Sequence, residues 1–145
     1  MDKKNLETSI IIRTKNEERY LEHVLLMLKK QTYKNFETVI VDDNSTDKTL
    51  EIAKKYNCKI VKIPEGKFNY PYACNFGIRE SIGEYIVFIS GHSIPINTKW
   101  LENGLTILSM KRLQEFLVID LCTTEYLCLK IFCIYLAESS ERKNS

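Results

Sequence analysis

The chain has 145 residues, of which 44% are hydrophobic and 28% are charged. This composition is typical of one globular domain and excludes the low hydrophobicity and high charge of disordered chains. A formal net charge of +2 is too balanced for a surface that binds a long polyanion, so we expect no nucleic-acid partner. At this length roughly two thirds of the unfolded surface can be buried, which is enough for a core without disulfides or structural metal.

Cysteine usage and the chain start indicate the compartment. No CxxC pair occurs, which predicts free thiols in a reducing environment. Met1–Asn5 leads into an apolar segment without a hydrophobic signal core, so secretion is not expected. The apolar stretch Phe116–Ala137 is interrupted by Asp120, Glu125 and Lys130, each costing about 2.5 to 3.5 kcal/mol near a membrane centre, so a spanning helix is not expected. The cysteines are Cys58, Cys74, Cys122, Cys128 and Cys133.

Strands and helices alternate in the first half of the chain. Thr8–Arg13 is a β-branched run that predicts a buried strand. From Asn16 onward apolar residues recur at helical spacing, which predicts an amphipathic helix. Phe36–Val41 predicts a second buried strand, and a helix is expected over Asp47–Tyr56. The apolar stripe of the first helix consists of Leu21, Val24, Leu25 and Leu28.

The alternation continues toward the middle of the chain. Cys58–Ile63 predicts a third strand, and Pro71 opens a helix that is expected to end near Gly83. Tyr85–Ile89 predicts a fourth strand that is apolar at every position. The pattern indicates an α/β fold, with a mainly parallel sheet that has helices on both faces. In such sheets ligands bind outside the carboxyl ends of the strands.

Two adjacent carboxylates, Asp42 and Asp43, follow the second strand. Successive side chains of a strand point to opposite faces, so only one of the two can face a shared cleft. A carboxylate there can accept hydrogen bonds from a ribose hydroxyl or a base N–H. The alternative is that both residues cap the following helix, because aspartate is favoured at caps.

Several familiar catalytic motifs are absent. No GxGxxG, GxxxxGK[ST] or GxSxG occurs, which removes the usual support for hydride transfer, ATP hydrolysis and the nucleophile-elbow hydrolases. His23 falls in the first helix, where an exposed helix residue is the expected role. His92 directly follows the fourth strand and lies at the ligand-binding edge. There it could bind a metal or a phosphate, or be a hydrogen-bonded loop histidine.

Four segments occur together in a recognisable order: Arg13–Glu17, Gln31–Glu37, Val41–Thr49, and Ala73–Ile78 followed by Gly83–Ile86. In combination they resemble the N-terminal, nucleotide-binding half of the inverting family 2 glycosyltransferases, over about residues 8 to 105. The resemblance implies the Rossmann-like GT-A fold, truncated after the donor-binding half.

The resemblance also implies roles for single residues. The family usually presents an Asp-x-Asp motif after the fourth strand, which holds Mn²⁺ or Mg²⁺ against the donor diphosphate. Ser90-Gly91-His92 stands there instead, similar to rhamnosyltransferase-like members. His92 is therefore expected to contact a metal or the diphosphate. The residues implied to bind the nucleotide are Thr14, Glu17, Asp43, which would contact the base, and Asn75.

The family further implies an activity and a location. The expected donor is a UDP- or dTDP-linked sugar, and the expected acceptor is a saccharide or lipid in cell-envelope polysaccharide synthesis. A cytoplasmic protein, with a peripheral association at the cytoplasmic face of the membrane, is implied. The alternative is an inactive truncated remnant that at most binds nucleotide. A nucleotidyltransferase is disfavoured, because no glycine-rich phosphate loop follows the first strand.

The resemblance ends after Leu105, which divides the chain into a donor-binding half, residues 1–105, and a tail, residues 106–145. The tail contains neither glycine nor proline. One hypothesis is a frameshift near Met110. The alternative is a native pair of short helices that covers the sheet edge. No catalytic base is identified, since Asp120 and Glu125 lie in the tail.

Overall fold

The computed structural model describes residues 7–111, 117–118 and 133–136. It contains a six-stranded sheet in the order β3-β2-β1-β4-β6-β5. The four strands predicted from the sequence are its parallel part, and two short antiparallel strands extend it beyond β4. The strands are β1 (Thr8–Thr14), β2 (Phe36–Asp42), β3 (Lys59–Lys62), β4 (Tyr85–Ser90), β5 (Leu117–Val118) and β6 (Cys133–Leu136).

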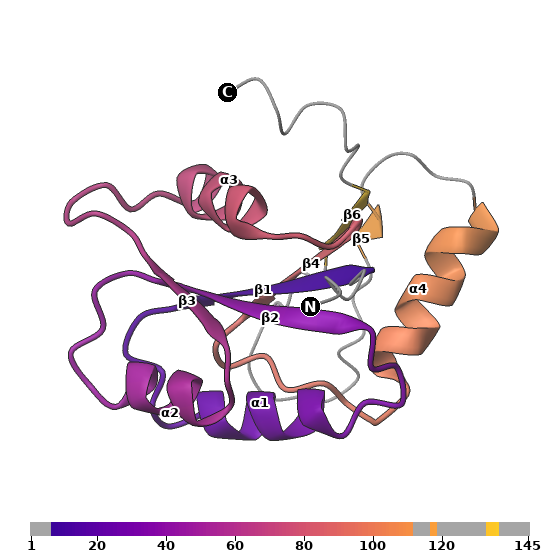
Figure 1. Cartoon of the computed structure of the whole chain (residues 1–145), viewed down its shortest axis with the longest axis horizontal. Coiled ribbons are helices and arrows are strands. Elements are labelled where there is room, and N and C mark those ends of the chain that lie inside the picture. Colours follow the sequence, from indigo (N-terminus) through magenta and orange to yellow (C-terminus); the bar gives the residue numbers. More distant parts are fainter. Residues whose placement is uncertain (1–6, 112–116, 119–132, 137–145) are drawn as a thin grey trace, which may run out of the picture.

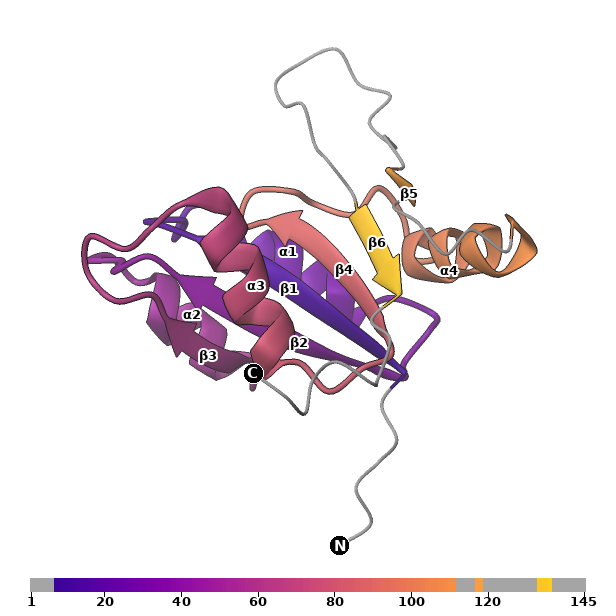
Figure 2. The ribbon, with the colours of Figure 1, turned by 90° about the horizontal axis from the view of Figure 1, so that it is seen from above.

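Helices cover both faces of the sheet, as predicted (Figure 1). Helices α1 (Leu21–Lys29) and α2 (Thr49–Lys55) lie on one face, and α3 (Tyr70–Glu80) lies on the other. Seen from above, α3 crosses over β1 and β2, while β6 lies beside β4 (Figure 2). Helix α4 (Trp100–Lys111) lies beyond the β4 side of the sheet.

The two faces of the sheet bury two separate apolar clusters, because alternate strand residues point to opposite faces. Ile10 and Ile12 of β1 pack with α1 and α2, whereas Ile11 packs with α3. The predicted apolar stripe of α1 is buried in the core, since all four of its residues are at most 3% exposed. This continuous burial makes the parallel sheet a rigid support for the loops at its carboxyl edge.

Helix α1 begins at Leu21, five residues later than predicted. The reason is that Asn16 adopts a left-handed backbone with φ 53°, which a helix cannot contain. The backbone N–H groups of Asn16, Glu17 and Glu18 donate to side chains of the loop after β2 instead of to helix carbonyls. Residues 15–20 therefore form a loop that reaches across the sheet edge.

The other boundaries differ less. Helix α3 has Asn69 as its N-cap, whose side chain accepts a hydrogen bond from Tyr72 N, and Pro71 lies in its first turn as predicted. The helix ends at Glu80 rather than near Gly83, because Ser81 is already extended. Residue Ser90 continues β4 by one position.

A buried amide joins α1 to the segment before α4. Gln31 is fully buried, and its Nε2 donates to the carbonyls of Met27 and Asn97 at 3.1 and 2.7 Å. Its Oε1 accepts from the N–H of Leu101 at 3.0 Å. Every polar atom of the amide is thus hydrogen-bonded, which fixes the position of the segment between β4 and α4.

Part of the tail falls within the described residues. Residues 106–111 are the end of α4, whereas Leu117–Val118 and Cys133–Leu136 are strands, so the alternative of a pair of short helices is wrong for these two segments. The other tail residues beyond Lys111, including Asp120, Glu125, Cys122 and Cys128, lie outside the described residues. The frameshift near Met110 and the boundary after Leu105 stay predictions.

No helix in the described part of the chain is long and apolar enough to cross a membrane. Cys58 and Cys74 are free thiols. Burial raises the pKa of Cys58 to about 12, so this thiol is unreactive at neutral pH.

Candidate functional site

The carboxyl ends of β1, β2 and β4 meet at one edge of the sheet. Hydrogen bonds between their backbones continue beyond the strands themselves. The N–H of Gly91 donates to the carbonyl of Arg13, and the N–H of Asp43 donates to that of Thr14, each at 2.9 Å. The segments predicted to hold the ligand are therefore held side by side.

Asp42 is an internal residue of this edge. Its side chain is fully buried and accepts from the hydroxyl of Thr14 at 2.9 Å and from the N–H and hydroxyl of Ser45 at 2.9 and 2.5 Å. Both carboxylate oxygens are occupied within the protein. Thr14 is only 3% exposed, so its hydroxyl holds Asp42 rather than facing outward. The structure thus makes Thr14 and Asp42 a link between the ends of β1 and β2.

Asp43 lies at the outer side of the same edge. Its side chain is 8% exposed, and Oδ2 lies 2.7 Å from the ammonium of Lys15. The Lys15 side chain is 64% exposed, so the ammonium stays in contact with solvent while the carboxylate that it pairs with is nearly buried. Neither aspartate of the pair caps α2, because Asp47 accepts the hydrogen bond from Thr49 N in the first turn. The capping alternative is therefore wrong.

Side chains join the loop after β1 to the loop after β2. Oδ1 of Asn16 accepts from Thr46 N at 2.8 Å, and Oδ2 of Asp47 accepts from Glu18 N at 3.0 Å. Oε2 of Glu18 in turn accepts from Lys48 N at 3.0 Å. These reciprocal bonds fix the edge around Asp43.

Glu17 and His92, which are 75 residues apart in sequence, contact each other directly. Nδ1 of His92 lies 2.8 Å from Oε1 of Glu17, and the Ser90 hydroxyl lies 3.0 Å from Nδ1 and 3.1 Å from Nε2. An ionised carboxylate only accepts hydrogen bonds, so this network assigns a proton to Nδ1. The imidazole is 37% exposed and Glu17 is 16% exposed. The ring is thus held from the protein side and remains open to solvent.

A third group at this edge was missed by sequence reasoning. The guanidinium of Arg13 lies 4.3 Å from the ring centroid of Tyr70, an exposed residue at the start of α3. This cation–π contact joins the end of β1 to the start of α3. The position of Arg13 at the end of β1 indicated that its side chain could lie at this edge. Its partner Tyr70 comes 57 residues later, so the contact was not predictable from the local sequence pattern.

Asn75 is the one predicted nucleotide residue that the structure does not bring to this cluster by a described contact. It is exposed in the middle of α3. Ala73 and Gly77, two residues away on each side, are buried and face the sheet. A helix turns by about 100° per residue, so Asn75 lies on the opposite side of α3 from them. Its predicted contact with the nucleotide stays a prediction.

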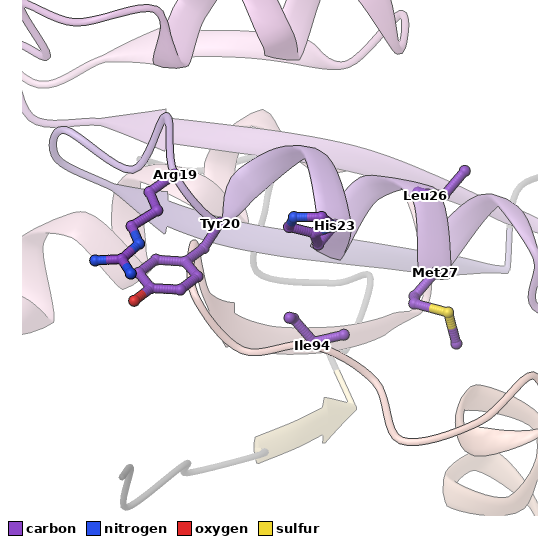
Figure 3. A pocket seen from close by; sticks show the side chains of 6 residues that line it. All are labelled: Arg19, Tyr20, His23, Leu26, Met27 and Ile94. Atoms are coloured by element: carbon purple, nitrogen blue, oxygen red, sulfur yellow. The ribbon is translucent and has the colours of Figure 1, made fainter. Parts of the chain in front are cut away.

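An apolar hollow lies outside the strand-end edge (Figure 3). It runs along the outer side of α1 to Ile94, in the segment after β4. No predicted site residue lines it, and His23, expected as an exposed helix residue, is exposed. The hollow is thus separate from the cluster around Asp43 and His92. Its lining residues are Arg19, Tyr20, His23, Leu26, Met27 and Ile94.

The donor set at this edge is a poor fit for a protein-held divalent cation. Nothing in the described part of the chain gathers three or more histidine, cysteine or acidic side chains at metal-binding distances. Glu17 and His92 are bonded to each other, so Nε2 of one imidazole, with the Ser90 hydroxyl 3.1 Å away, is what this pair could offer a metal. One imidazole does not make a metal site, and Mg²⁺ prefers carboxylate oxygens.

The fold and the edge define the class of protein: an α/β domain whose ligand site lies at the carboxyl ends of a parallel sheet. The family model for glycosyl transferase family 2 matches residues 9–112. The chain therefore belongs to glycosyl transferase family 2 and has the N-terminal half of its GT-A fold, as the motif order predicted.

Relatives of known or inferred activity share this part of the chain. A dolichyl N-acetyl-alpha-D-glucosaminyl phosphate 3-beta-D-2,3-diacetamido-2,3-dideoxy-beta-D-glucuronosyltransferase from Methanococcus voltae is 39% identical over 114 residues, covering 74% of this chain and 35% of that protein. An uncharacterized glycosyltransferase from Rickettsia typhi is 32% identical over 134 residues, covering 92% of this chain and 41% of that protein. The chain thus spans well under half the length of these relatives.

Solved structures show the same arrangement. Residues 1–349 of TarS from Staphylococcus aureus superpose with a TM-score of 0.71 and 27% identity, covering 84% of this chain and 38% of that one. The complex of the same TarS fragment with UDP-GlcNAc gives a TM-score of 0.67 at 25% identity, covering 83% and 37%. A mannosyltransferase from Pyrobaculum calidifontis, solved with GDP-Man and Mn²⁺, shares the fold at 23% identity and a TM-score of 0.63, covering 71% and 32%.

Proposed function

We propose that this chain is the donor-binding part of a glycosyltransferase that takes a UDP- or dTDP-linked sugar. The acceptor we propose is a saccharide or lipid of a cell-envelope polysaccharide. The family gives the reaction class, and the TarS complex with UDP-GlcNAc supports a pyrimidine nucleotide as the donor carrier. Cytoplasmic location and peripheral association with the membrane belong to this proposal.

The observation that carries the proposal is the state of Asp43. Its carboxylate is nearly buried, and its partner Lys15 is mostly exposed. Asp43 can therefore accept a hydrogen bond from a ligand N–H beside Lys15, whereas Asp42 has no free oxygen to offer. Uracil and thymine both carry an N–H donor at the ring edge, and a carboxylate acceptor recognises it.

The rest of the edge supplies positive charge and hydrogen-bond donors. Breaking the bond between sugar and diphosphate leaves negative charge on the leaving phosphate, which nearby cations and N–H groups stabilise. Lys15 and His92 are the candidates in the described residues. The inverting reaction also needs a carboxylate base for the acceptor hydroxyl, and no residue of this chain is identified as that base.

A thermal-shift titration tests the donor pocket. UDP, dTDP, GDP and ADP are compared, each with EDTA and with Mn²⁺. At a hundred times its dissociation constant, a nucleotide stabilises the fold by about 2.7 kcal/mol, a shift of several degrees for a domain of this size. We expect selective stabilisation by UDP or dTDP, and its loss in Asp43→Ala. Glu22→Ala, which removes an exposed carboxylate on α1 paired with Lys55, is the matched control and keeps the shift.

A second candidate is a remnant that binds nucleotide without catalysis, because Ser90-Gly91-His92 lacks the carboxylates of the family's Asp-x-Asp motif. The two are separated by the release of UDP from UDP-GlcNAc. Release that disappears in Asp43→Ala supports the enzyme. Binding of UDP without any release supports the remnant, and a cooperative melt that no nucleotide shifts contradicts both.

A further inference from the structure

We infer that His92, positioned by Glu17, contacts the diphosphate of the donor directly, without a metal ion between them. The inference rests on the proposed function and names how that site holds its phosphates. It also changes the role of Glu17, which we expect to act through His92 instead of touching the nucleotide.

The first step is the orientation of the ring. Glu17 accepts from Nδ1 of His92 at 2.8 Å, and this bond turns Nε2 away from the carboxylate. The turn from Ser90 to Ser93, closed by a 2.9 Å backbone hydrogen bond, places the imidazole at the strand-end edge. The exposed part of the ring is therefore available to a ligand that lies against the ends of β1 and β4.

The second step is the fixed position of Glu17. Its backbone N–H donates to the hydroxyl of Thr49 at 2.8 Å, so the residue is anchored to the start of α2. Its Cβ and Cγ pass directly beside Gly91, where a Cβ would come within 3.1 and 2.7 Å of them. A carboxylate held at its backbone and along its stem is pre-organised to hold the imidazole.

The third step is the chemistry of Nε2. When Nε2 also carries a proton, the imidazolium donates its Nδ1–H to Glu17 and its Nε2–H to a phosphate oxygen, which makes two charge-assisted hydrogen bonds. A metal ion at Nε2 would have a single strong protein ligand in the described part of the chain, far from the three that open metal sites use. The donor set therefore favours direct contact with phosphate.

Calorimetric titration of the full chain with UDP, in EDTA and in Mn²⁺, tests the inference. Uridine, which has the base and ribose without phosphates, is titrated in parallel by NMR chemical shifts. We expect UDP to bind in EDTA with a dissociation constant within about threefold of that in Mn²⁺. In His92→Gln the affinity for UDP falls by about ten- to a hundredfold, while that for uridine changes by less than about twofold.

Two further variants separate positioning from structure. Glu17→Gln keeps a hydrogen-bond acceptor near Nδ1 but removes the charge, and we expect a loss of UDP affinity of about three- to tenfold with uridine binding unchanged. His23→Gln, at the other histidine of the chain, is the matched control and leaves both affinities unchanged. Cooperative melting of each variant verifies its fold.

The outcomes distinguish the inference from the proposed function. UDP binding that needs Mn²⁺ overturns the inference and leaves the proposed function standing. Equal UDP affinity in His92→Gln and in the unmodified chain also overturns it. If neither UDP nor uridine binds, the proposed function fails and the inference fails with it.

Discussion

Gly91 shows how the absence of a side chain shapes the part of the proposed site around Glu17 and His92. A Cβ at this position would lie 2.7 Å from Cγ of Glu17 and 3.1 Å from Cγ2 of Thr14. Glycine therefore allows the fourth strand to approach the loop after β1 closely enough for His92 to reach Glu17. The middle residue of Ser90-Gly91-His92 is thus required by packing, whatever ligand the flanking residues take.

Gly91→Ala is expected to push Glu17 aside, because the stem of a side chain anchored at its backbone has little room to move. We expect a loss of about 1 to 3 kcal/mol in the free energy of unfolding and a loss of UDP affinity similar to that of Glu17→Gln. Urea unfolding and calorimetry measure the two effects. Gly77→Ala, whose Cβ would lie 2.6 Å from Cγ2 of Ile11 in the core, is the control that lowers stability alone. Unchanged UDP binding in Gly91→Ala contradicts the prediction.

At the scale of single residues, the sequence predicted the difference between the two aspartates better than it predicted the contacts of the other site residues. Strand alternation alone requires Asp42 and Asp43 to differ, and one is internal while the other lies at the edge. The contact between Glu17 and His92 was not predictable, since it depends on how closely two distant loops approach. Asn75 was assigned to the nucleotide site from the order of the motifs. Its exposure follows from its position on the side of α3 that faces away from the sheet.

At the scale of elements, the loops after β1 and β2 behave as one unit. The sequence predicted a helix from Asn16 because Glu17 and Glu18 are typical of a first turn. In the structure their N–H groups bond to the opposite loop, and tertiary hydrogen bonds override the local preference. Asp47 is central to this unit, since it accepts from Glu18 N and from both the N–H and the hydroxyl of Thr49.

The link through Asp47 is expected to depend on pH. Burial alone would raise the pKa of Asp47, but hydrogen bonds from Thr49 and Glu18 outweigh it and lower this pKa below its usual 3.8. A lowered folded-state pKa contributes stability above the unfolded value, and that contribution is lost as the pH falls through the folded value. Asp47→Ala should therefore cost about 0.5 to 2 kcal/mol at pH 7 and less at pH 2.5.

Urea unfolding at the two pH values measures this difference. Glu51→Ala is the control, because Glu51 lies in the first turn of α2 but makes none of these loop contacts. Its effect is expected to be small at both pH values. A cost of Asp47→Ala that grows on acidification would show that the carboxylate is not the source of the stability.

At the scale of the whole molecule, the parallel pairing of the first four strands was predicted from their alternation with helices. The order β3-β2-β1-β4 was not predicted, because right-handed crossovers allow more than one strand order. The antiparallel strands β5 and β6 were not predicted, because two- and four-residue strands carry no readable period. The pairing of β6 with β4, and of β5 with β6, follows from tertiary structure alone.

Both apolar clusters draw their buried residues from positions 10 to 101, so residues 1–111 are expected to fold without the rest of the chain. Truncation after Lys111 removes the four residue pairs between β4 and β6, at about 0.2 to 1 kcal/mol each. We therefore expect a single cooperative melt at a lower temperature and unchanged UDP affinity, since every residue of the proposed site precedes Ser93. The exposed edge of β4 is also expected to promote self-association at high concentration, measured by light scattering. A truncated chain that does not fold would show that β6 is part of the core, and one that folds without binding UDP would place an essential ligand contact in the tail.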